Sequence, residues 1–209
     1  MPGEVADRVG VVLAVEFALQ VTDGQSMPLA FAQLATALGV PEGERVPLST
    51  VRSTVLQLRA AKGMVLDAAD PDTRSAGSFF TNPIVSARIA AGLPSDAPRW
   101  PVDPDQPDLV IPLGELANYA HLLSAPIDDA DQRVKLSAAW LIEHAGIAKG
   151  YSIFKSRAAV SSKHTLALTN RGGATADEIA QLARLIQSRV QSEFGVWLQP
   201  EPVCINVEL

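Results

Sequence analysis

Apolar and polar residues alternate most regularly between residues 11 and 21. Large apolar side chains occupy the odd positions, namely Val11, Leu13, Val15, Phe17, Leu19 and Val21. The even positions hold smaller or polar residues: Val12, Ala14, Glu16, Ala18 and Gln20. Because successive side chains of a β-strand point to opposite faces, this pattern predicts a strand with one face in a core. Asp23-Gly24 then predicts a turn.

Helical spacing of apolar residues predicts short helices over residues 29–38, 111–123 and 136–144. A further helix is expected to begin with Ser49 as its N-terminal cap and to stop at Gly63. The apolar stripe of that helix consists of Val51, Val55 and Leu58.

The clearest helical signal lies near the end of the chain. Thr175 and Glu178 have the spacing of a capping box, and Gly195 supplies a stop. The predicted buried side consists of Ile179, Leu182, Ile186 and Val190. Residues 164–169 and 196–207 are predicted to be extended. Strands and helices mix without a repeating βαβ rhythm, which favours an α+β fold with a mixed, mainly antiparallel sheet packed with helices.

The heptapeptide Gly77-Ser78-Phe79-Phe80-Thr81-Asn82-Pro83 combines a hydroxyl, an aromatic pair and an amide. If it is extended, Ser78, Phe80 and Asn82 share one face, and Phe79 anchors the other face in a core. A hydroxyl and an amide would then face a ligand together. The same spacing also suits an ordinary half-buried strand, and both interpretations stay open.

Composition narrows the protein class. The chain has 209 residues, 47% hydrophobic and 19% charged, enough to bury a core in one or two domains. The longest apolar run, residues 9–15, is too short to span a bilayer, and the first residues lack the pattern of a signal peptide. One cysteine, Cys204, and three histidines without ligand spacing provide no metal cluster. We therefore expect a cytoplasmic, metal-free protein that does not insert into a membrane.

Charge is unevenly distributed along the chain. The net charge is −6, and residues 91–134 carry it, with eight acidic residues against two basic ones. Seven prolines between Pro94 and Pro126 suggest that this acidic segment is largely a surface excursion. Residues 135–171 carry six basic residues against Glu143, which suits an anionic small molecule such as a diphosphate. Nucleic acid is not expected because the chain is acidic overall, but a solvated basic face is an open alternative.

Several stretches, taken in order, resemble one family of peptidoglycan synthesis: UDP-N-acetylenolpyruvoylglucosamine reductase, also called UDP-N-acetylmuramate dehydrogenase or MurB. The stretches that carry the resemblance are residues 59–62, 77–83, 135–143, 162–170 and 198–201. The actinobacterial branch looks closest, as judged from Lys62-Gly-Met-Val-Leu-Asp67 and Asn170-Arg-Gly-Gly-Ala-Thr175.

The resemblance also implies what this chain lacks. Family members begin with a FAD-binding region that holds a glycine-rich loop with a Ser-Asn step, and nothing here matches it. Residues 1–209 therefore resemble the C-terminal, substrate-binding domain, with the acidic proline-rich insertion at about 91–134. FAD and NADPH are implied for the complete enzyme. No cofactor is expected on this chain alone, and the missing FAD-binding domain is an implied partner.

The family's reaction implies roles for two residues. Reduced FAD delivers hydride to the enolpyruvyl ether of UDP-N-acetylglucosamine enolpyruvate, and protonation of the neighbouring carbon gives UDP-N-acetylmuramate. Ser78 matches the proton donor, and Glu201 matches a second active-site acid that stabilises the enolic intermediate. From the residues alone, Glu201 reads as a solvent-facing strand residue.

Six further positions match substrate-binding residues of the family: Phe31, Lys62, Asn82, Trp100, Lys135 and His164. The resemblance implies that Lys62 faces the diphosphate, Asn82 a phosphate or sugar, and Trp100 the uridine. Phe31 and Trp100 replace tyrosines and keep a stacking face. Structural readings stay open beside these roles: a helix-end charge for Lys62, a surface charge for Lys135, a structural imidazole for His164 and a buried ring for Phe31.

Two main functions remain as hypotheses. The chain is either the catalytic substrate domain of the reductase, inactive without its FAD domain, or a non-catalytic nucleotide-sugar-binding module. Both hypotheses need Lys62 and Asn82, whereas only the catalytic one needs Ser78 and Glu201. A structural protein that uses its acidic segment as an interaction surface is a third possibility.

Overall fold

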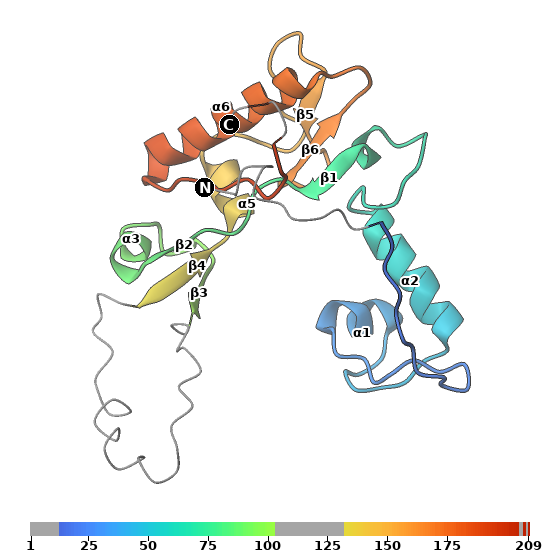
Figure 1. The fold of residues 1–209 in the computed structure, drawn as a ribbon. Helices are drawn as coiled ribbons and strands as arrows, with labels where there is room; N and C mark the ends of the chain where they lie inside the picture. The colour runs from blue at the N-terminus through green and yellow to red at the C-terminus, as the bar shows by residue number, and fades with distance from the viewer. Residues whose placement is uncertain (1–12, 103–131, 205–206, 208) are drawn as a thin grey trace, which may run out of the picture.

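The computed structural model describes residues 13–102, 132–204, 207 and 209, and within them the fold is α+β, as predicted (Figure 1). The helices are α1 (Ala32–Leu38), α2 (Leu48–Ala60), the 3-10 helix η2 (Pro71–Thr73), α3 (Ala87–Ala91), α5 (Ala138–His144) and α6 (Ala176–Phe194). The strands are β1 (Ser75–Ser78), β2 (Ile84–Ser86), β3 (Arg99–Val102), β4 (Arg133–Leu136), β5 (Ala158–Val160) and β6 (Ala167–Asn170).

Two three-stranded antiparallel sheets organise the strands, in the orders β1-β6-β5 and β2-β4-β3. Helix α6 lies across the first sheet, where it contacts β5 and β6 (Figure 1). The register of β1 against β6 shifts between Ser75 and Ser78. Gly77 lies within that shift and has a φ of 82°, a backbone conformation that glycine adopts without the cost other residues incur.

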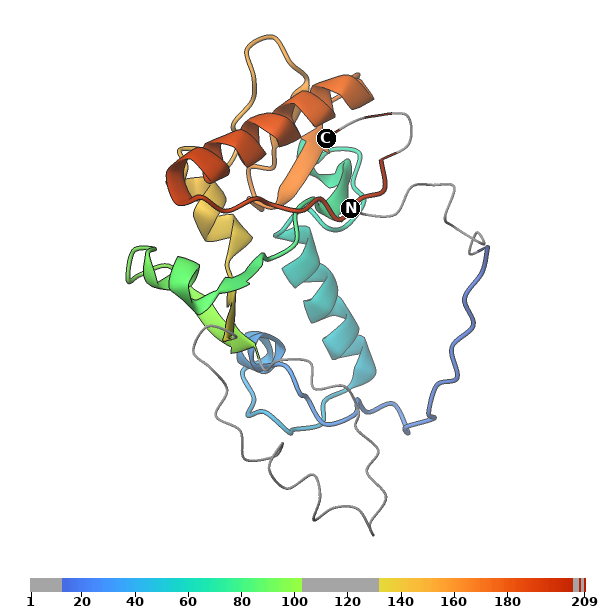
Figure 2. The ribbon, with the colours of Figure 1, turned by 60° about the vertical axis from the view of Figure 1, so that its left-hand side comes forward.

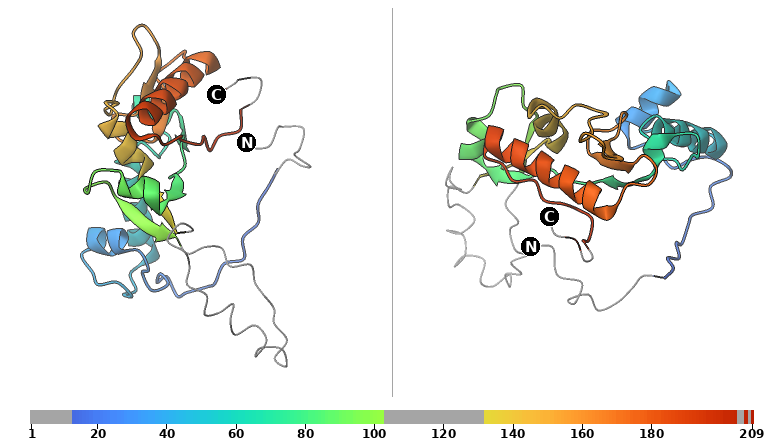
Figure 3. Two further views of the ribbon diagram at one scale, coloured as in Figure 1. Left: turned by 90° about the vertical axis from the view of Figure 1, so that its left-hand side faces the viewer. Right: turned by 90° about the horizontal axis from the view of Figure 1, so that it is seen from above.

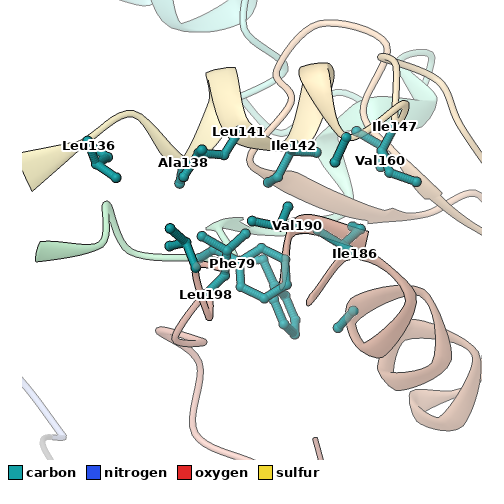
Figure 4. Close-up of a cluster of buried hydrophobic side chains, with 14 of the residues drawn as sticks. Phe79, Leu136, Ala138, Leu141, Ile142, Ile147, Val160, Ile186, Val190 and Leu198 are labelled. Carbon is teal, nitrogen blue, oxygen red and sulfur yellow. The ribbon is translucent and has the colours of Figure 1, made fainter. Parts of the chain in front are cut away.

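One hydrophobic core joins the first sheet, α5, α6 and the segment after α6 (Figure 4). Its fully buried members include Leu141, Ile186 and Leu198. Phe79 and Phe80 both belong to this core, with exposed fractions of 8% and 1%, and their rings meet edge to face at 5.1 Å. The predicted division of the heptapeptide is therefore wrong for Phe80, because the core takes both aromatic rings rather than one.

Helix α6 confirms its local signals. The Thr175 hydroxyl accepts from the backbone N–H of Glu178, the Glu178 carboxylate accepts from the N–H of Thr175, and Gly195 ends the helix in the left-handed conformation. Three of the predicted core positions, Leu182, Ile186 and Val190, are fully buried. The capping box also fixes the loop before β5, because Glu178 accepts from the backbone N–H of Arg157 at 2.8 Å.

The two helices before residue 61 are where predicted, but one cap is not. Helix α2 begins after Pro47 with no side-chain cap, so Ser49 lies inside its first turn rather than at its start. None of the residues in α2 is buried, and its predicted apolar stripe is only half covered. The buried residues of this part of the chain are Ser26, Leu29 and Ala35.

The regular alternation before these helices does not produce a strand. Residues 13–21 are extended but belong to neither sheet, and they run apart from the helices and strands (Figures 2 and 3). Their apolar side chains are exposed: Leu13 93%, Val15 65%, Phe17 77%, Leu19 86% and Val21 98%. The predicted burial is wrong within the described residues, because these side chains have no core to enter. Val11 lies outside the described residues.

Other extended segments differ from prediction in extent. The strand expected over 164–169 is β6, displaced towards Asn170 because a turn occupies residues 161–166. Residues 196–204 run along Phe79–Thr81 and form a single bridge, between Phe80 and Pro200. Within the acidic segment, Arg99–Val102 forms β3 and Arg133 begins β4, while Trp100 and Pro101 are exposed at the surface. Its middle, including the helix predicted over 111–123, lies outside the described residues.

Candidate functional site

Ser78 lies at the end of β1, with its backbone fixed on both sides. It pairs with Ala167 of β6, and the N–H of the next residue, Phe79, donates to the carbonyl of Leu166 at 2.7 Å. Ser78 itself is half-buried, while the two phenylalanines that follow are held in the core. The hydroxyl is therefore carried on rigid backbone at the margin of the core.

The backbone brings Glu201 next to this strand. The N–H of Glu201 donates to the carbonyl of Phe79 at 2.9 Å, and Thr81 donates to the carbonyl of Gln199 at 3.0 Å. This pairing places the two predicted catalytic residues on adjacent chain segments, although 123 positions separate them in the sequence. The Glu201 residue is exposed, as the reading from its residue type alone expected.

A buried amide holds the Glu201 segment against α6. The Gln187 side chain, 1% exposed, donates through Nε2 to the carbonyl of Leu198 at 2.9 Å. An amide at this position of a helix otherwise reads as a surface residue, so the sequence carries no clear signal for this contact.

Asn82 links the first sheet to the second. Its side-chain oxygen accepts from the backbone N–H of Ala138 at 2.9 Å, at the start of α5, and Ile84 begins β2 two residues later. Because the oxygen is already bonded, the NH₂ group is the part of Asn82 that suits an acceptor on a ligand, such as a phosphate or sugar oxygen.

Lys135 and Trp100 meet on the second sheet. They are directly paired across β4 and β3, and Ile84 of β2 is the partner of Lys135 on the other side. Directly opposed residues of antiparallel strands project from the same face. The structure thus places an exposed ammonium beside an exposed indole, whose exposed fraction is 49%.

His164 lies near the strand of Ser78. Its backbone carbonyl accepts a hydrogen bond from the N–H of Ala167 at 3.0 Å, and Ala167 is the strand partner of Ser78. Burial lowers the pKa of His164, and the ammonium groups of Lys62 and Lys149 lower it further. The imidazole is therefore neutral at neutral pH. Its Nδ1 is buried without a hydrogen-bond partner among the described residues.

Close packing of the residue after Lys62 explains why Lys62 lies near His164. Gly63, with φ at 69°, packs so closely on Asp72 that a Cβ at residue 63 would lie 3.2 Å from the Asp72 Cβ. Asp72 in turn accepts hydrogen bonds from the backbone N–H of Ser162 at 3.2 Å and from its hydroxyl. The end of α2 is thereby pressed against the turn at residues 161–164, which places Lys62 near His164.

Two residues of this arrangement were not predicted as site residues. Asp72 is buried, and its only signal in the sequence is a place in a polar loop. Lys149 was predicted only as one charge of the basic segment, and its position near His164 depends on the pairing of Gly150 with the Ser161 carbonyl at 3.2 Å.

The basic segment is less available to a ligand than its charge suggests. Three of its six cations help to hold the fold: Lys163 pairs with Asp70 at 2.6 Å, Arg171 with Asp72 at 3.6 Å, and Arg157 donates to the carbonyl of Gly172 at 2.9 Å. The other three are Lys135, Lys149 and Lys155. The prediction of an anion site therefore rests on Lys135 and Lys149 rather than on the whole segment.

Phe31 is 74% exposed at the start of α1, which excludes the alternative of a buried ring. It belongs to a part of the chain that shares no strand with either sheet, so its grouping with the other residues stays a prediction. A cavity of about 720 Å³ lies between β2 and the segment after α6. Of the predicted site residues, only Asn82 lines it.

Among the described residues, no three His, Cys, Asp or Glu side chains are grouped to hold a metal ion. No described helix is long and apolar enough to cross a bilayer. Gly172-Gly173, the one adjacent glycine pair in the sequence, packs on the side chains of Arg74 and Arg157. Gly172 is half-buried and Gly173 is exposed.

Comparison with known proteins agrees with the resemblance. The chain is 54% identical to the UDP-N-acetylenolpyruvoylglucosamine reductase of Leifsonia xyli, over 96% of this chain and 54% of that protein. The reductases of Nocardia farcinica and Streptomyces coelicolor are each 48% identical, over 95% of this chain and 47% of their own length. The chain thus spans about half the length of these curated relatives.

The part of the chain that carries Ser78, Asn82, His164 and Glu201 also matches a family model. That model describes the C-terminal domain of UDP-N-acetylenolpyruvoylglucosamine reductase and matches residues 70–205, well over half of the chain. The chain therefore belongs to the family of the UDP-N-acetylenolpyruvoylglucosamine reductase C-terminal domain.

Proposed function

We propose that this chain is the substrate-binding part of a UDP-N-acetylenolpyruvoylglucosamine reductase, with Ser78 as proton donor and Glu201 as the second acid. The observation that carries the proposal is the backbone pairing of Glu201 with Phe79, which unites the segments of both acids inside the family match. The substrate would be UDP-N-acetylglucosamine enolpyruvate, and the reaction would belong to cytoplasmic peptidoglycan synthesis.

Substrate binding would use two groups of residues. Lys62 and Lys149 each lie near the neutral His164, and two ammonium groups that form no ion pair among the described residues suit the diphosphate of a nucleotide sugar. Trp100 and Lys135, side by side on the second sheet, suit a stacked base with a nearby anionic or carbonyl group. Asn82 connects the two groups and has N–H donors to offer.

The chemical role of this chain would be the proton. Reduction of the enolpyruvyl double bond adds a hydride equivalent to one carbon and a proton to its neighbour. A serine hydroxyl is a weak acid, so it must be held against the developing negative charge to act. The fixed backbone at Ser78 supports such a role. Glu201 is exposed here, so a hydrogen-bond-donating carboxyl would need further polypeptide to cover it.

The family resemblance implies FAD and NADPH for the complete enzyme. These cofactors would bind to the part of the relatives' length that this chain does not span. The isolated chain is therefore expected to bind substrate without turnover, as the alternative of a non-catalytic binding module also requires.

Calorimetric titration with UDP-N-acetylglucosamine enolpyruvate tests binding. Lys62→Ala should weaken binding at least tenfold, because a charged phosphate contact is lost. The matched control is Lys155→Ala, which removes an exposed lysine beside Phe154 and should leave affinity unchanged. Equal effects of the two substitutions, or no binding by a folded sample, would contradict the proposed site.

A second substitution separates catalysis from binding. Ser78→Ala should leave substrate affinity within about twofold, because it removes a hydroxyl needed mainly when charge develops on the substrate. In the enzyme assembled with the rest of the polypeptide, it should slow the protonation step. Unchanged turnover would reject the proton-donor role and leave the binding module as the better description.

A further inference from the structure

The side chain of Arg99, the first residue of β3, donates hydrogen bonds to three backbone carbonyls. Its Nη1 donates to Ala90 at 2.9 Å, its Nη2 to Pro94 at 2.5 Å and its Nε to Ala97 at 3.2 Å. These carbonyls belong to the last turn of α3, to the loop after it and to the approach to β3. One planar guanidinium therefore joins three successive points of the chain, a task that suits its rigid fork of N–H donors.

The contacts of Arg99 stabilise an end of α3 that has little stability of its own. The helix has only five residues, too few to be stable through its own hydrogen bonds. Arg99 forms no ion pair among the residues that the structure describes, so its positive charge is directed at backbone carbonyls. A cation at the C-terminal end of a helix and charge-assisted hydrogen bonds are both favourable. The guanidinium therefore fixes the loop between α3 and β3.

Arg99 and Trp100 project from opposite faces of the second sheet. Arg99 is paired with Leu136, which is 1% exposed, whereas Trp100 is paired with Lys135. Successive residues of a strand point to opposite faces, and directly opposed residues share a face. Helix α3 packs on β2 and β4, and its Ala90 belongs to the same core as Leu136 (Figure 1). The guanidinium thus holds β3 from the core side, while the indole and the ammonium lie on the other side.

A second contact fixes the start of β3 next to another predicted substrate residue. The carbonyl of Pro98 accepts from the backbone N–H of Ser137 at 3.2 Å. The N–H of the following residue, Ala138, donates to the side chain of Asn82 at 2.9 Å. The start of β3 is therefore held between the Arg99 contacts and the segment that orients Asn82, so the place of Trp100 relative to Asn82 depends on both.

We propose that Arg99 is a positioning residue for recognition of the nucleotide base. Through the loop between α3 and β3, its guanidinium holds Trp100 beside Lys135 before a ligand arrives, so that binding orders little further polypeptide. Arg99 does not contact the ligand and acts through Trp100. This inference rests on the proposed function for the assignment of Trp100 to the base.

NMR of the indole N–H groups tests the positioning role without a ligand. The sequence has three tryptophans, Trp100, Trp140 and Trp197, and a Trp100→Phe spectrum identifies the signal of Trp100. Arg99→Leu should lower the heteronuclear NOE of the Trp100 indole, because the loop before β3 is released, and leave the other two indoles unchanged. An unchanged Trp100 signal, or an equal fall at all three indoles, would overturn the proposal.

Calorimetric titration with UDP and with pyrophosphate tests the consequence for binding. Arg99→Leu should weaken UDP binding about tenfold, because the indole must then be ordered on binding, and leave pyrophosphate affinity within about twofold, because pyrophosphate has no base. The matched control is Arg88→Leu, which makes the same change at an exposed arginine of α3 and should alter neither affinity. Equal weakening of both ligands by Arg99→Leu, or equal effects of the two substitutions, would reject the positioning role.

Arg99→Lys covers the case in which Arg99→Leu does not fold. Lysine keeps the charge but presents its donors from one nitrogen instead of three, so it cannot reproduce the three contacts. It should change the Trp100 signal and UDP affinity in the same direction as leucine, and wild-type behaviour in both measurements would overturn the proposal. A wild-type chain that binds neither UDP nor pyrophosphate would reject the proposed function, while the Trp100 signal would still decide whether Arg99 holds the indole.

Discussion

Asp72 offers the sharpest test of how the fold positions the candidate site. Its side chain is 2% exposed and accepts hydrogen bonds from the N–H and hydroxyl of Ser162, and Arg171 lies 3.6 Å away. Asp72→Ala removes the acceptor for both Ser162 donors. A hydrogen bond to a charged group contributes about 1.5–3 kcal/mol, and Ser162 is exposed enough for water to replace part of that.

We therefore expect Asp72→Ala to lower the free energy of unfolding by about 3 kcal/mol. For a chain of this length, that loss corresponds to a fall in Tm of about 6–12 °C. Asp72→Asn keeps one acceptor oxygen and should fall between the alanine variant and wild type. Calorimetric or circular-dichroism melting of the three proteins measures the effect.

The matched control is Lys163→Ala, which removes the neighbouring ion pair with Asp70 but leaves the Asp72 contacts in place. That pair is solvent-exposed, so its loss should shift Tm much less. Asp72→Ala should also weaken substrate binding, because the turn that carries His164 loses its anchor, whereas Lys163→Ala should not. Equal Tm shifts for the two alanine variants would refute the reasoning.

Four other predictions follow from the electrostatics and caps. Lys149→Ala should raise the pKa of His164 towards its ordinary value, as followed by NMR titration, whereas Lys155→Ala should not. Because the pKa of His164 is lowered in the folded chain, the unfolded chain binds this proton first as the pH falls. The free energy of unfolding should therefore decrease as the pH drops below about 6.5. In denaturant titrations, His164→Gln should make that free energy less dependent on pH. Thr175→Ala should cost about 1 kcal/mol by removing the cap of α6. Hydrogen bonds from the backbone N–H groups of Thr175 and Arg157 lower the pKa of Glu178 to about 2. The contribution of the Glu178 carboxylate to the free energy of unfolding should be complete above the ordinary pKa of glutamate and disappear as the pH falls towards 2. A free energy of unfolding that stays constant across that range would contradict this prediction.

Local signals were sufficient for the helices that depend on them. The capping box at Thr175 and the stop at Gly195 act within a few residues, so the bounds of α6 could be predicted. The stop after α2 at Gly63 was also visible, but Ser49 was misread as its cap because several polar residues compete for the start of a helix. Backbone contacts fix the start instead: Pro47 bridges Gln25, and the N–H of Leu48 donates to the carbonyl of Gly24 at 2.9 Å.

Alternation alone led to two wrong predictions for the same physical reason. The pattern at residues 13–21 and the offset of Phe79 from Phe80 both specify which side chains share a face, but not what covers that face. In the described chain the first face is exposed, and Phe80 is buried with Phe79. Burial is a property of two surfaces together, and a sequence pattern describes only one of them.

The residue types and their order were enough to identify the family and to single out Ser78, Asn82, His164 and Glu201. The fold class also follows from local patterns, because capping and periodicity act over a few residues. Only the tertiary structure placed Glu201 beside the strand of Ser78 and brought Lys149 near His164. It also showed that Asp72 holds the end of α2 against the turn that carries His164. These contacts join segments tens of residues apart, and their geometry depends on how the core packs rather than on any local signal.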